Sequence, residues 1–238
     1  MFQPEIISET ENFIVVNKPA GLLTVPDRFD DKLPSLKKIL ENKYGRIFIV
    51  HRLDRDTSGI ILFAKNETAH RYYSQLFENR EAVKIYLGLV HGSLPDKKGT
   101  IDVPIAEHPV KKGRMVTTAK GKPSVTHYEV LEDFSLYSLV QFQIETGRTH
   151  QIRVHMQHLG NPIACDELYG TGQPVYLSSL KRKFKLSKQE EERPLLQRLG
   201  LHSWQLHFKD ESGKLHCPEA PLPKDLRALL QQLRKWKQ

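Results

Sequence analysis

The chain has 238 residues, of which 39% are hydrophobic and 27% charged, a balance that excludes a disordered protein. No apolar run approaches the ~18 residues that a membrane helix needs, so we predict no membrane association. The formal net charge of +8 favours a polyanionic partner such as RNA or DNA, although a basic surface without a specific partner stays open.

The N-terminal stretch and the cysteine content indicate the compartment. The first residues, MFQPEIISETENF, lack the basic and apolar regions of a signal peptide, and the chain contains two cysteines, Cys165 and Cys217. Few cysteines and no leader are typical of a reducing environment. We therefore expect a cytoplasmic protein in which both cysteines are thiols.

Strand-like and helix-like patterns follow one another along the chain without regular alternation. Apolar runs predict strands over 13–17, 47–50, 59–64, 82–92, 124–131 and 135–144, and a hairpin over 201–223. Amphipathic spacing with capping residues predicts helices over 35–44, 66–80, 148–160 and 225–238. Residues 93–124 are expected to form turns, and residues 181–194 a charge-dense insert.

The order of these elements predicts an α+β fold. There is no βαβ alternation and no GxGxxG or GxxxxGK[ST] phosphate loop, which argues against a Rossmann or ATP-dependent enzyme. No shift in composition marks a domain boundary. We expect a single domain over residues 1–238 around a largely antiparallel, mixed sheet.

A polar insert, HRLDRDTSG, separates two strand-like runs at residues 51–59. Asp54 lies between Arg52 and Arg55, and a nearby guanidinium keeps a carboxylate ionised. An ionised, oriented carboxylate is suited to act as a nucleophile or a general base. Structural Asp–Arg pairs are common, so the residues alone leave both interpretations open. For Asp56 we favour a turn.

A second cluster, TGRTHQIRVHMQHLGNP, occupies residues 146–162. If the helix begins at Thr149, His150 and Arg153 share a face. Arg148 then lies at the helix start, where the helix dipole disfavours a cation, which suggests an anionic partner. An ordinary solvated face is the alternative. The spacing of the histidines is poor for metal ligands and there is no CxxC, so no metal is predicted.

A third segment, KIYLGLVHG, contains Tyr86 on a predicted strand. Most such tyrosines are core residues with a satisfied hydroxyl group. The functional alternative is an aromatic platform for a nucleobase, with Lys84 on the same face toward a phosphate.

Together these three segments resemble the RluA family of RNA pseudouridine synthases. Residues 51–59 match its HRLDxxTSG motif throughout, and KIYLGLVHG is similar to KxYxAxVxG with Gly88 in place of Ala. ETGRTHQIRVHMQHLGNPIACDELYG resembles the third motif, with Cys165 where Gly is usual. The resemblance extends from about residue 12 to about residue 226, and leaves no room before it for the small S4 RNA-binding domain that many members carry.

The resemblance implies a catalytic domain with a central RNA-binding cleft, which converts uridine to pseudouridine in a structured RNA. The target base must be flipped out of its stack to be reached. tRNA, ribosomal RNA or both are the implied partners. The isomerisation needs no metal, nucleotide or other cofactor. A monomer is our default expectation.

The resemblance also implies roles for particular residues. Asp54 is the implied catalytic carboxylate, Arg153 pairs with it and keeps it ionised, and Tyr86 stacks on the base and assists removal of the C5 proton. We expect five further residues to contact the substrate, with His51 and Arg52 also open to a role in ordering the loop: Arg52, His51, Lys84, Arg148 and His150.

Two other classes of function stay open. A non-catalytic RNA-binding protein or RNA chaperone explains the basic charge but gives no reason for Asp54. A hydrolytic nuclease needs clustered metal-binding carboxylates, which the sequence does not offer, and EDTA insensitivity would separate it from a synthase.

Overall fold

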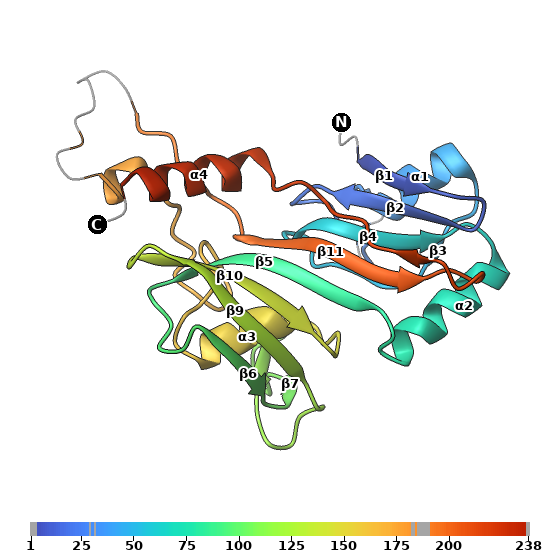
Figure 1. Cartoon of the computed structure of the whole chain (residues 1–238), viewed down its shortest axis with the longest axis horizontal. Coiled ribbons are helices and arrows are strands. Elements are labelled where there is room, and N and C mark those ends of the chain that lie inside the picture. Colours follow the sequence, from blue (N-terminus) through green and yellow to red (C-terminus); the bar gives the residue numbers. More distant parts are fainter. Residues whose placement is uncertain (1–3, 29, 31, 182–183, 185–190, 237–238) are drawn as a thin grey trace. The chain divides into compact units, whose positions relative to one another are not determined.

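The computed structural model describes residues 4–28, 30, 32–181, 184 and 191–236, and the chain divides into two compact units (Figure 1). The first unit comprises Met1–Tyr86 and His202–Pro221, and the second comprises Leu87–Leu201 and Leu222–Gln238. Two strands, β5 (Val83–His91) and β11 (Leu201–Lys209), therefore contribute residues to both units.

The first unit is built on strands in the order β1-β2-β4-β11. Neighbours are antiparallel except β4 and β11, which are parallel. The short strand β3 pairs with β4, and β12 forms a hairpin with β11. The bounds of its other elements are β1 (Glu5–Glu9), β2 (Phe13–Lys18), α1 (Leu36–Tyr44), β3 (Phe48–Ile49), β4 (Ser58–Ala64), α2 (Glu67–Glu78) and β12 (Leu215–His216).

Local sequence explains the helices of this unit. The Ser35 side chain accepts from the backbone N–H of Lys38 at the start of α1, and Asn66 Oδ1 accepts from the N–H of Ala69 at 2.8 Å at the start of α2. The apolar face of α2 packs beside β4, where Tyr73 meets Phe13 edge-to-face in the core. The predictions of both helices are confirmed.

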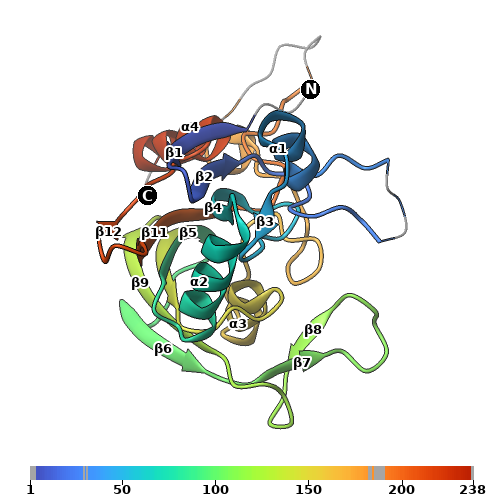
Figure 2. The same cartoon turned by 90° about the vertical axis from the view of Figure 1, so that its right-hand side faces the viewer.

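The second unit contains strands in the order β5-β10-β9-β6, of which β10, β9 and β6 are antiparallel neighbours. A separate two-stranded hairpin, β7–β8, extends from the end of β6 (Figure 2). The bounds are β6 (Lys98–Asp102), β7 (Ile105–Glu107), β8 (Met115–Thr117), β9 (Val125–Asp133), β10 (Tyr137–Ile144), α3 (Gln151–His158), η1 (Leu177–Ser179) and α4 (Lys224–Lys235).

The predicted α+β class and largely antiparallel mixed sheet are confirmed. The prediction of turns over 93–124 is wrong, because β6, β7 and β8 lie there. The many Pro, Gly and Lys residues of this region gave it the appearance of turns; a Cβ on Gly99 of β6 would lie 2.6 Å from the Tyr128 ring across the strand pair, so a larger residue there would require this ring to move. β1 was also not predicted. Most of the insert at 181–194 falls outside the described residues.

Candidate active site

The HRLDRDTSG segment forms the loop between β3 and β4 in the first unit. Asp54 is half-buried there, and its carbonyl accepts from the N–H of Thr57 at 3.3 Å, which closes a turn. The Arg55 guanidinium binds the Asp56 carboxylate through two contacts of 3.1 and 3.3 Å. The side chain of Asp56 is thus engaged by its neighbour Arg55.

Both residues beside Asp54 are held by the end of β2 and the segment that follows it. The Thr24 hydroxyl donates to the carbonyl of Leu53 at 2.9 Å and accepts from its N–H at 3.2 Å. The fully buried Lys18 ammonium donates to the Arg55 carbonyl at 2.8 Å, where the Gly21 N–H also donates at 2.9 Å. The backbone on either side of the carboxylate is therefore fixed.

Parallel pairing of β4 with β11 fixes the end of the same loop. A Cβ on Gly59, whose φ is +112°, would lie 2.0 Å from the Ser203 carbonyl oxygen, so only glycine permits this approach. His202 Nε2 lies 3.2 Å from the Ala220 carbonyl and must carry the proton, since a carbonyl only accepts. The Ser58 hydroxyl therefore donates to His202 Nδ1, at 2.9 Å.

Tyr86 lies close enough to Asp54 to sense its charge. Burial, opposed by a hydrogen bond with Ser203 and reinforced by the negative charge of Asp54, raises the pKa of the Tyr86 hydroxyl to about 12. Only 7% of Tyr86 is exposed. The phenol is consequently neutral at physiological pH, and the two residues expected to perform chemistry lie in one electrostatic environment.

His51 and Lys84 meet the same aromatic ring. The imidazole of His51 stacks on Phe77 at 4.5 Å between centroids, and its Nε2 accepts from the N–H of Leu62 at 3.0 Å. Burial, with the nearby Lys84 charge, lowers the pKa of His51 to about 3. The buried Lys84 ammonium lies 6.0 Å from the Phe77 ring centroid, and burial lowers its pKa. Neutral His51 thus fixes the loop to β4, while Arg52 is exposed.

Arg153 lies on α3 in the second unit and is 7% exposed. Its Nε donates to Asp166 Oδ2 at 2.7 Å and its Nη2 donates to Asp166 Oδ1 at 2.9 Å. The ring centroid of Tyr169 is 5.1 Å from its guanidinium carbon. Neither Asp166 nor Tyr169 was singled out in the sequence.

The start of α3 differs from the prediction. The helix begins at Gln151, because the Gln151 side chain accepts from the Arg148 N–H at 3.0 Å and from the Thr146 hydroxyl at 2.7 Å. His150 adopts a left-handed conformation with φ 55°. Arg148 therefore precedes the helix and donates to the Pro123 carbonyl at 3.2 Å, so the argument from the helix dipole does not apply to it.

The expected site residues thus form two groups. Asp54, Tyr86, Lys84, His51 and Arg52 belong to the first unit, and Arg153, Arg148 and His150 to the second. In the second group, His150 and Arg153 both contact Tyr169. The ion pair between Asp54 and Arg153 and the roles in substrate binding stay predictions.

Across the residues that the structure describes, no three His, Cys, Asp or Glu side chains gather in a way that could hold a metal ion. Over the same residues, no helix is long and apolar enough to cross a membrane.

Known proteins are similar to this chain both in sequence and in fold. The family described as RNA pseudouridylate synthase matches residues 12–158. The structure of Human RNA Pseudouridylate Synthase Domain Containing 4 aligns with a TM-score of 0.73 and 25% identity over 97% of this chain and 93% of that one. Human RNA Pseudouridylate Synthase Domain Containing 1 aligns with a TM-score of 0.70 and 27% identity over 98% and 95%.

Sequence relatives agree. The chain is 38% identical to Ribosomal large subunit pseudouridine synthase D of Nitrosomonas europaea over 97% of this chain and 65% of that protein. It is 36% identical to the RNA pseudouridine synthase YlyB of Bacillus subtilis over 97% and 73%, and 33% identical to Ribosomal large subunit pseudouridine synthase D of Escherichia coli over 97% and 70%. The chain belongs to the RNA pseudouridylate synthase family, whose members are isomerases. The resemblance seen in its three motifs is confirmed.

Proposed function

We propose that this chain isomerises uridine to pseudouridine in a structured RNA, with Asp54 as the catalytic carboxylate. The observation that carries the proposal is the held loop: Leu53 and Arg55 are both fixed through their backbone, so the backbone that carries the Asp54 carboxylate is held in place. Tyr86 lies within reach of its charge. A preorganised carboxylate is what a nucleophile or base requires.

The chemistry is balanced without a co-reactant. The N1–C1′ bond of the uridine breaks, the uracil turns, and a C5–C1′ bond forms, while the C5 hydrogen leaves as a proton and N1 takes up a proton from water. No electron, phosphoryl group or hydride is transferred, so neither a metal nor a nucleotide has a step to perform. Asp54 is paired with Arg153 in this proposal, and Tyr86 stacks on the flipped base. Because Tyr86 is neutral, it assists the removal of the C5 proton through a hydrogen bond from its hydroxyl group and not as the base, and the proton passes to water.

The substrate class follows from charge and from relatives. A net charge of +8 suits a polyanion, and the relatives in Nitrosomonas europaea and Escherichia coli are named for the large ribosomal subunit. We propose ribosomal RNA as the substrate to test first and tRNA second, bound in a cleft by Arg52, His51, Lys84, Arg148 and His150. We also propose that the protein acts as a monomer in the cytoplasm.

The test is tritium release from RNA labelled at uridine C5, with ribosomal RNA and tRNA prepared separately from cells that lack the protein. EDTA is present throughout, and RNA length is checked on a gel. Release of tritium with intact RNA supports the proposal. Binding without release from either pool would indicate an RNA-binding protein, and shortened RNA would indicate a nuclease; both outcomes contradict it.

A further inference from the structure

We propose that Asp166 and Tyr169 are positioning residues, which set the direction and the plane of the Arg153 guanidinium for the reaction. This inference rests on the proposed function and extends it to two residues outside the expected site. Both come from the ACDELYG segment after α3, in the second unit.

The direction of Arg153 is set by a two-point contact. Asp166 binds Nε at 2.7 Å and Nη2 at 2.9 Å, which engages two of the five guanidinium N–H groups. A bidentate pair fixes the rotation of the guanidinium about its long axis, whereas a single contact does not. The side chains are 9% and 0% exposed, so water does not compete for either partner.

Asp166 is itself unable to rotate. Its Oδ1 also accepts from the N–H of Leu168 at 2.9 Å and from the N–H of Tyr169 at 3.0 Å, and its carbonyl accepts from Gly170 and Gly172. The loop is therefore built around this carboxylate. Desolvation makes a buried ion pair a weak source of stability. The arrangement is better explained by accurate placement of Arg153 than by a contribution to folding.

Tyr169 sets the plane of the Arg153 guanidinium. Its ring centroid lies 5.1 Å from the Arg153 guanidinium carbon, a distance suited to a cation–π contact. The hydroxyl accepts from the N–H of Met115 on β8 at 2.8 Å and shares a second hydrogen bond with His150 Nδ1, also at 2.8 Å. With 2% exposure and its hydroxyl tied on two sides, the ring is held in place.

The experiment compares Asp166→Asn with a matched control, Asp225→Asn. Asp225 binds Arg198 through the same bidentate geometry, at 2.6 and 2.6 Å, in the same unit. We expect Asp166→Asn to lower the single-turnover rate at saturating RNA about tenfold or more, with the RNA dissociation constant changed by roughly twofold or less. Asp225→Asn should keep the wild-type rate, even if its thermal stability falls.

A double-variant cycle separates positioning from a structural role. In an Arg153→Lys background the bidentate contact is already lost, so Asp166→Asn should produce no further decrease in rate. A structural role predicts the same decrease in both backgrounds. If Asp166→Asn does not fold, Asp166→Glu replaces it, because this variant keeps the charge but shifts the carboxylate by one methylene and should also lose rate.

Two results would overturn the inference alone, and a third would overturn the proposed function. Wild-type rate in a folded Asp166→Asn or Asp166→Glu variant would overturn the inference alone. An equal decrease in rate when Asp166→Asn is introduced into the wild type and into the Arg153→Lys variant would also overturn the inference. No turnover by the wild-type protein on either RNA pool would overturn the proposed function instead. Tyr169→Phe keeps the ring but loses the two hydrogen bonds that hold it, so its rate should fall, by less than that of Asp166→Asn; a wild-type rate in this variant would overturn the role of the Tyr169 hydroxyl.

Discussion

Thr24 holds Leu53, the residue immediately before Asp54, at both of its backbone polar groups. The hydroxyl donates to the Leu53 carbonyl at 2.9 Å and accepts from its N–H at 3.2 Å, and Thr24 is 3% exposed. Because the two residues are 29 positions apart, one buried hydroxyl couples two distant segments of the first unit at the base of the loop. Removal of the Thr24 hydroxyl should lower both the free energy of unfolding and the reaction rate.

Thr24→Val keeps the shape of the side chain and removes the hydroxyl. Two buried backbone groups then lose their partner, so we expect the free energy of unfolding to fall by about 2 kcal/mol. The reaction rate should fall as well, since the loop that carries Asp54 is released. Thr24→Ser retains the hydroxyl and is the control, and denaturant unfolding with tritium release measures both effects. Equal stability and rate in the Val and Ser variants would contradict this role.

Tyr86 should act as a neutral phenol. Since the pKa of its hydroxyl is raised to about 12, its deprotonation should not appear in the activity profile between pH 7 and 10. Tyr86→Phe keeps the stacking ring but loses the hydroxyl, and we expect a decrease in rate of about 10² with RNA binding retained. Filter binding beside single-turnover assays measures this. A break in the wild-type profile near pH 9 that Tyr86→Phe abolishes would count against the assignment.

His51 should make the folded state less stable as the pH falls. Its pKa is lowered to about 3 in the folded state because the ring is buried and lies near the positive charge of Lys84, so the unfolded chain binds the proton more readily. The stabilisation is complete above the unfolded pKa near 6.5 and is lost as pH falls toward 3. Each pH unit in that window costs up to about 1.4 kcal/mol.

Chemical denaturation at pH 7.5 and pH 5 tests this dependence. His51→Gln cannot be protonated, and we expect its stability to fall less than that of the wild type between the two pH values. An identical fall in both proteins would show that other groups account for the acid sensitivity.

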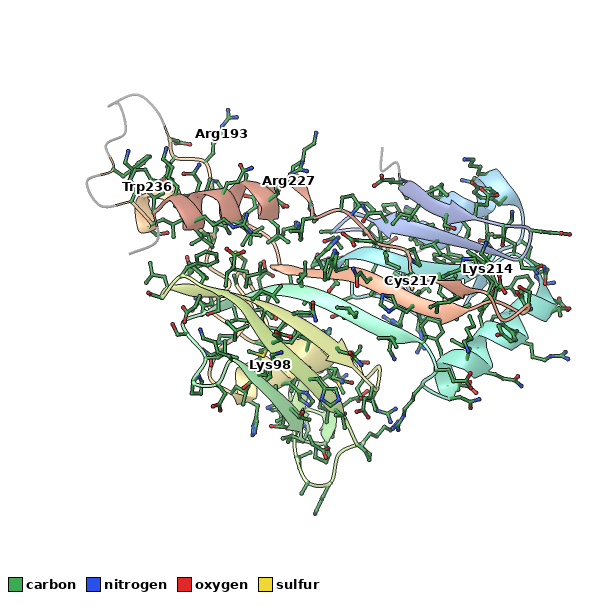
Figure 3. All side chains as sticks on the ribbon, in the orientation of Figure 1. Lys98, Arg193, Lys214, Cys217, Arg227 and Trp236 are labelled. Atoms are coloured by element: carbon green, nitrogen blue, oxygen red, sulfur yellow. The ribbon has the colours of Figure 1, made fainter. Side chains whose placement is uncertain are left out.

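The two cysteines should differ sharply in reactivity. Cys217 is exposed after β12 (Figure 3). Cys165 is 4% exposed, and burial raises its pKa to about 11. Thiolate is the reactive form, so a disulfide reagent should modify Cys217 quickly and Cys165 only after unfolding. Cys217→Ser should abolish the fast phase, and a fast phase that persists in this variant would be inconsistent with the burial of Cys165.

Local sequence patterns predicted those parts of the fold that depend on residues close together in the sequence. Ser35 and Asn66 act as the helix caps that their positions suggest, and the alternating apolar residues of β10 form a strand. The three motifs identified the family because their order and content are distinctive. The start of α3 was misplaced by its helical spacing, since the Gln151 side chain and the positive φ of His150 end the preceding turn.

The supporting residues of the site could not be predicted, because their partners are distant in sequence. Nothing in ACDELYG indicates that Asp166 binds a guanidinium 13 residues earlier. Likewise, nothing near Thr24 or Lys18 indicates contacts with the loop around Asp54. These contacts depend on how the chain packs.

Asp54 performs the reaction in the proposed function, and a neighbouring carboxylate offers the sharpest control. Asp54→Asn and Asp56→Asn each remove one charge from the same loop, but Asp56 is engaged by Arg55. Tritium release and RNA binding are measured for both variants and for the wild type. We predict that Asp54→Asn binds RNA and releases no tritium, while Asp56→Asn retains release. Normal release by Asp54→Asn would show that this carboxylate does not perform the reaction.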